Sequence, residues 1–204
     1  MSRPTRWLAT ICSIALVGAI LATPAEAQDS RIRQRLDPTT AGRVTALLDS
    51  ARAQGLPTEP LVQKALEGES KGAPSPRIVA ALQALLSGLG QARLSLGERA
   101  SDDELVAGAL WLRAGGAAGE LARLRAGAPT RSLAVPLVVS ADLVARGWPI
   151  REAFADVERL LEAGVTDRDF LSLRSQVDRA VMNGESVSDA VRREVSRLRP
   201  ERQP

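Results

Sequence analysis

The stretch VTALLDSARAQGLPTEPLVQKALEGESKGAPSP (residues 44–76) decides the fold class. Its first ten residues place Val44, Leu47, Leu48 and Ala51 at the i, i+3, i+4, i+7 spacing of one helix face. Turns that contain Gly and Pro then separate further runs of the same period. Alternating, strand-like runs are scarce elsewhere in the chain, and aromatic residues make up only 2% of it. The sequence therefore predicts an all-α protein.

Capping signals mark where the expected helices begin. Asp37 before Pro38 and Ser75 before Pro76 each place an N-cap residue before a proline in the first helical turn. Three further helix starts fit a capping box, in which an acidic residue follows the N-cap by three positions. These are Ser101 with Glu104, Thr166 with Asp169, and Ser186 with Asp189. These signals predict helices over 38–54, 58–70, 75–95, 101–114, 117–126, 130–146, 149–163, 166–183 and 186–198.

Glycines mark where the expected helices end. Gly55, Gly72, Gly147, Gly164 and Gly184 each follow an amphipathic run, at the position of a left-handed C-cap. The loops that result are short, so consecutive helices should pack as neighbouring hairpins. We expect short helical hairpins arranged in a bundle or a solenoid-like array.

The N-terminal segment has the pattern of a secretory signal peptide. Two arginines precede an apolar run over residues 8–22, and an Ala-Glu-Ala motif ends at Ala27. We expect residues 1–27 to be removed by cleavage between Ala27 and Gln28, and the product to be exported to the periplasm or the medium. An uncleaved signal anchor is the alternative. No second apolar segment has the length of a transmembrane helix.

The remaining chain is expected to form one domain. We predict a flexible mature N-terminus over 28–36, a single all-helical domain over 37–199, and a disordered tail over 200–204. A domain of this length can be stabilised by its apolar core alone.

A weak internal repeat is visible within that domain. When the sequence is aligned with itself, Gly55 and Gly72 fall on Gly147 and Gly164. This alignment suggests two four-helix halves, 37–115 and 128–199. Helical hairpins share such patterns by chance, so both readings stay open.

Composition excludes several classes of function. The formal net charge is +3 and the pI is 9.9, but acidic residues are interleaved with the arginines along the chain, so we expect no nucleic-acid binding. The chain has no His, and its single cysteine, Cys12, lies in the signal segment. We therefore expect no disulfide, no cofactor, no metal site and no catalysis. A hydrolase that uses two converging carboxylates is the lowest-ranked alternative.

The segment GESKGAPS (68–75) resembles a phosphate-binding loop only superficially. Lys71 precedes Gly72, the glycine spacing is wrong for such a loop, and the preceding run is helical. We interpret the segment as a turn between helices, in which Glu67 and Lys71 form an i, i+4 ion pair. The alternative is that these two side chains contact a partner.

Two other places are less ordinary than their surroundings. Asp142 lies in the most apolar expected helix, four residues before Arg146, which favours an ion pair on one helix face. An aspartate facing a ligand pocket is the alternative. Trp148, between Gly147 and Pro149, fits a hydrophobic contact at a helix entry or an exposed partner surface.

These observations favour an exported, non-catalytic interaction or scaffold protein with a protein or peptide partner. The alternative is a carrier of a small apolar ligand or lipid, with an apolar pocket between helices near Asp142 and Trp148. No stretch of the chain resembles a known family closely enough to assign a function or a site.

Overall fold

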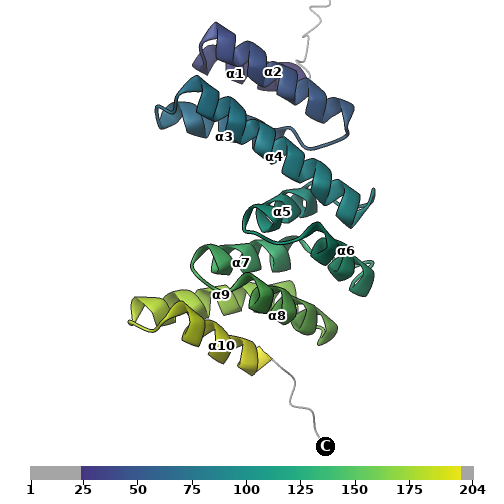
Figure 1. The fold of residues 1–204 in the computed structure, drawn as a ribbon, viewed down its shortest axis with the longest axis vertical. Helices are drawn as coiled ribbons and strands as arrows, with labels where there is room; N and C mark the ends of the chain where they lie inside the picture. The colour runs from purple at the N-terminus through teal and green to yellow at the C-terminus, as the bar shows by residue number, and fades with distance from the viewer. Residues whose placement is uncertain (1–23, 199–204) are drawn as a thin grey trace, which may run out of the picture.

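The computed structural model describes residues 24–198, and in this range the chain forms ten α-helices and no strand (Figure 1). The prediction of an all-α protein is therefore confirmed. The helices are α1 (Pro24–Arg35), α2 (Pro38–Ala53), α3 (Glu59–Ser70), α4 (Ser75–Leu96), α5 (Asp102–Arg113), α6 (Ala118–Gly127), α7 (Ala134–Ala145), α8 (Ile150–Glu162), α9 (Asp167–Met182) and α10 (Val187–Leu198).

The helices stack along one long axis, with α1 and α2 at one end and α9 and α10 at the other (Figure 1). Every substantial contact joins helices that are one or two places apart in the sequence. Four antiparallel hairpins pack in this way, namely α1–α2, α3–α4, α7–α8 and α9–α10. Between them, α5 packs on α4 and α7, and α6 packs on α4 and α8. This one-dimensional packing is the solenoid-like array that the sequence allowed.

A single apolar core runs through the stack from α1 to α10. Successive layers each contribute fully buried side chains, among them Leu48, Leu82, Leu105, Leu137 and Val177. These residues recur at helical spacing in the sequence, so the apolar face of each helix is the face that packs on its neighbours.

Most of the predicted caps form. Asp37 accepts hydrogen bonds from the backbone N–H groups of Thr39 and Thr40, at 3.1 and 3.0 Å. The hydrogen bonds from Thr40 hold the pKa of the Asp37 carboxyl below its ordinary value. The capping boxes that begin at Ser101 and Thr166 are both present. All five predicted C-cap glycines adopt a positive φ, as the left-handed cap requires.

Two predicted helix starts differ from the structure. The N-cap of α4 is Pro74, and Ser75 is the first helical residue, whose Oγ donates to Asp37 Oδ2 at 3.3 Å. Helix α7 begins at Ala134 and not near residue 130, because the backbone before it forms a turn around Arg125. The guanidinium of Arg125 donates to the carbonyl oxygens of Ala128 and Arg131, at 3.1 and 2.9 Å.

The prediction of a flexible segment over 28–36 is wrong for most of its length, because residues up to Arg35 lie in α1. Ile32 is fully buried, and Arg31 and Asp29 form ion pairs of 2.9 Å with residues of α3 and α2. The sequence gives little sign of this helix, since its few apolar residues form no continuous stripe.

The N-terminal and C-terminal predictions fall largely outside the described residues. Helix α1 crosses the predicted cleavage point between Ala27 and Gln28. Residues 1–23, which hold most of the predicted signal peptide, and the predicted tail 200–204 are outside the described range. Signal cleavage and the tail therefore stay predictions.

The packing gives no support to the predicted halves 37–115 and 128–199. The suggested shift lays α3 over α8, yet α3 is the first helix of its hairpin and α8 is the second helix of its own. The repeat therefore stays a hypothesis from the sequence.

Candidate functional site

Glu67 and Lys71, the first pair predicted as partner contacts, lie at the C-terminal end of α3. The Glu67 carboxylate is bound by Lys64 at 2.8 Å and by Lys71 at 2.5 Å. Hydrogen bonds from these two ammonium groups lower the pKa of Glu67 to about 2. The predicted i, i+4 ion pair is therefore present, with a second cation beside it.

Asp142 and Arg146 also form their predicted ion pair, at 2.8 Å along α7. Two charges of α9 extend it, because Arg174 lies 3.1 Å from Asp142 and Asp178 pairs with Arg146. The hydrogen bond to Asp178 is the main reason that the pKa of Arg146 is raised. These four charges join α7 to α9.

Trp148 is a core residue, with 3% of its surface exposed. It occupies the turn between α7 and α8, where the guanidinium of Arg192 lies 5.6 Å from the centroid of its ring. Because the indole is covered, the structure favours the hydrophobic contact at a helix entry over the exposed partner surface. The five predicted contact residues therefore do not come together at one place.

A small cavity lies beside Trp148, among residues of α7, α8, α9 and α10 that include Leu143, Val157 and Phe170. Its volume is about 20 Å³. That is room for about one water molecule, since a single water needs about 10–15 Å³ measured in this way. This cavity is therefore too small for the apolar ligand of a carrier.

A larger, open groove lies between α4 and α5, and the sequence analysis did not single it out. Its volume is about 470 Å³, within the range of ligand-binding clefts. The groove's floor, as we call it, consists of Ala81, Ala84, Leu85 and Gly88 of α4 with Ala109, Leu110 and Leu112 of α5. The groove's rim consists of Lys64 of α3, Ser87 and Gln91 of α4, and Arg113 of α5.

Small side chains explain why this place is hollow. Ala81, Ala84 and Gly88 recur about once per turn along one face of α4. The backbones of α4 and α5 approach closely there, because a Cβ placed on Gly88 would lie 3.3 Å from the Cβ of Ala109. Beside this contact Leu85 and Leu110 stay only half-buried. The floor is therefore apolar surface that no described part of the chain covers.

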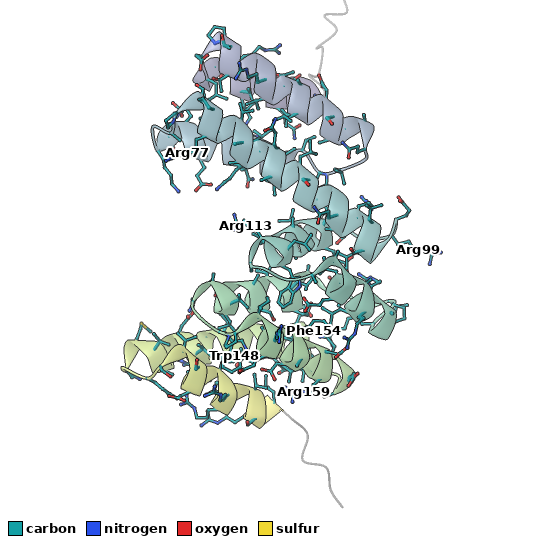
Figure 2. The ribbon with its side chains drawn as sticks, viewed as in Figure 1. Arg77, Arg99, Arg113, Trp148, Phe154 and Arg159 are labelled. Carbon is teal, nitrogen blue, oxygen red and sulfur yellow. The ribbon has the colours of Figure 1, made fainter. Side chains whose placement is uncertain are left out.

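The charged side chains that line the groove, Lys64 and Arg113, are both positive. No carboxylate lines it among the described residues. Arg113 is exposed and forms no hydrogen bond or ion pair with any described residue. Figure 2 shows Arg113 at the end of α5, on the same side of the stack as Arg77, with Arg99 on the opposite side. The groove thus combines an apolar floor with an unpaired cation at its edge.

A second cleft, between the α4–α5 loop and the α6–α7 loop, is polar and internally paired. The Glu104 carboxylate at its base accepts N–H groups from Leu133 at 2.9 Å and Ser101 at 3.0 Å, and it pairs with Arg125. Burial alone would raise the pKa of Glu104, but these partners outweigh burial and hold the pKa below its ordinary value. Glu104 and Arg125 therefore serve to join α5, α6 and α7.

Within residues 24–198, none of the helices combines the length and the apolar character needed to cross a bilayer. No group of three or more potential metal-ligating side chains occurs in the same range.

Comparisons with protein-family models, with curated proteins and with solved structures find no match to this chain.

Proposed function

We propose that the protein is an exported, non-catalytic interaction protein that binds a segment of another protein in the groove between α4 and α5. The observation that carries this proposal is the groove's floor, where half-buried leucines and small residues stay open to solvent beside an otherwise closed core. Exposed apolar surface with a polar edge is typical of a protein-binding site.

The architecture supports the same proposal. Stacked helical hairpins present long surfaces on which a partner segment can lie, and helix-in-groove binding is a common form of peptide recognition. The carrier alternative has less support, because the apolar cavity beside Trp148 has a volume of only about 20 Å³, and the open cleft of about 420 Å³ that Trp148 also borders is lined by charged side chains that include Arg151 and Glu152. Proposed export rests on the sequence of residues 1–27.

The proposal is tested by native mass spectrometry on protein purified gently, without detergent, from the organism that makes it. The intact mass reports cleavage between Ala27 and Gln28. We expect a protein partner at a fixed ratio to the wild-type chain. The partner should be lost from an Ala84→Trp variant, because the indole fills the groove.

Ala122→Trp is the matched control, because Ala122 is an exposed alanine of α6 that does not line the groove. A partner that Ala84→Trp retains would contradict the groove as the binding site. A small-molecule adduct that disappears on denaturation, with no protein partner, would instead favour the carrier.

A further inference from the structure

We infer that the occupant of the α4–α5 groove is an acidic amphipathic helix of the partner protein. This inference rests on the proposed function and adds the chemistry of the partner. It is argued from the shape of the floor and the charge of the groove's surroundings.

The shape of the floor suits a helix. Ala81, Ala84 and Gly88 project little from α4, so the backbone of a second helix can approach to the separation of about 8–10 Å found between packed helices. The apolar side chains of that helix can then pack on Leu110 and Leu112, the part of the floor that α5 contributes. A β-strand peptide would need an open sheet edge, and residues 24–198 form no strand. A polyproline-type peptide would need aromatic side chains, and none of the described residues that line this groove is aromatic.

The length of the groove sets the length of the occupant. Along α4 the lining runs from Ala81 to Gln91, which at 1.5 Å per residue is roughly 15 Å. A helix of about three turns covers this distance. Short isolated helices are marginal in water, so the segment should form its helix on binding or belong to a folded partner.

The positive charge around the groove favours a partner helix with acidic residues beside its apolar face. Arg113 has no partner among the described residues, and Arg77 is an exposed, unpaired cation one turn before Ala81 on the same face of α4. Lys64 adds a third cation, although Glu67 binds it. Carboxylates beside the apolar face of a bound helix would complement this excess, whereas lysines there would be repelled.

The inference is tested with three fluorescent helical peptides of about 18 residues, long enough to form helix in part. They share one face of Leu and Ala and carry Glu, Gln or Lys at the flanking positions. Binding to the full chain is measured by fluorescence anisotropy at low and high salt. We expect the Glu peptide to bind most tightly, the Lys peptide most weakly, and the difference to shrink with salt.

Charge-reversal variants locate the effect. Arg113→Glu should weaken the binding of the Glu peptide by roughly fivefold, which is the effect expected of one partly exposed charge pair. The affinity for the Gln peptide should stay nearly unchanged. Arg99→Glu is the matched control, because Arg99 is also exposed and unpaired but lies on the opposite side of the stack (Figure 2). It should change neither affinity.

The possible outcomes separate the inference from the proposed function. Equal affinity for all three peptides, abolished by Ala84→Trp, would overturn the acidic partner and leave the groove as a helix-binding site. Binding of no peptide, or binding that Ala84→Trp leaves intact, would overturn both. Binding of phosphatidylglycerol vesicles instead of peptides, lost in Arg113→Glu, would overturn the inference and assign the surface to lipid.

Discussion

Three segments of the chain converge on the side chain of Glu104. Its carboxylate completes the capping box of α5 and accepts a hydrogen bond from the N–H of Leu133 at the start of α7. The same carboxylate pairs with Arg125 of α6. Its side chain is only 7% exposed. Buried charges that lose a partner are costly, because the groups left behind can no longer reach water.

Replacement of Glu104 by Gln should therefore destabilise the protein. The amide can still accept one backbone N–H, but it leaves the partly buried guanidinium of Arg125 without its counter-charge. We expect a loss of about 2–4 kcal/mol in the free energy of unfolding, measured by urea denaturation. Glu98→Gln, at an exposed position, serves as the control and should change the value by less than about 0.5 kcal/mol.

The same carboxylate predicts a dependence of stability on pH. The pKa of Glu104 in the folded protein lies below its ordinary value, so the unfolded chain takes up this proton first as the pH falls. The contribution of Glu104 is complete above about pH 4.3, the ordinary value, and is lost as the pH falls through the folded pKa. Thermal melts between neutral and acidic pH should show a shallower acid limb for Glu104→Gln than for the wild type. Parallel limbs for the two proteins would contradict this assignment.

The helices whose ends carry capping residues could be predicted from the sequence. Asp37, Ser101 and the C-cap glycines act within a few residues of their own position, so the sequence alone shows them. Helix α1 carries no such signal. It is held by Ile32 and by ion pairs with residues far along the chain, such as Arg31 with Glu59.

The groove between α4 and α5 could not be predicted for the same reason. Ala84 and Gly88 are ordinary helix positions when each is considered alone, and Leu110 fits a core position equally well. Only the packing of α5 on α4 leaves these side chains side by side and open. The Glu104–Arg125 pair, which spans two helices, was hidden in the same way.

The docking of α1 can be tested through Ile32, whose side chain is fully buried. We expect Ile32→Ala to remove about 2–4 kcal/mol of packing free energy. Because α1 is at the end of the stack, the loss should appear as local opening. Hydrogen exchange should speed up at the amides of α1 and stay unchanged in α4 and α5. Leu94→Ala, at a side chain that is 87% exposed, should leave all rates as they are.

Across the whole molecule, stability should be local because each helix packs only on helices one or two places away. Phe170→Ala in α9, where the ring is 1% exposed, should cost about 3–5 kcal/mol. We expect hydrogen exchange to show the loss of protection in α9 and α10, with little change in α1 to α4. Leu171→Ala, one residue later and 50% exposed, is the control. An even loss along the entire stack would contradict one-dimensional coupling.

The placement of the first and last hairpins at opposite ends of the long axis gives the protein a mechanical character (Figure 1). Tension between the ends is transmitted equally along the stack, but the outermost hairpins have neighbours on one side only and should detach first. Unravelling α9 and α10 (167–198) would release roughly 100 Å of extended chain, at about 3.3 Å per residue. A folded layer is about 10 Å thick. Under load the molecule would therefore lengthen in discrete steps from its ends inward, while the groove between α4 and α5 kept its shape until last.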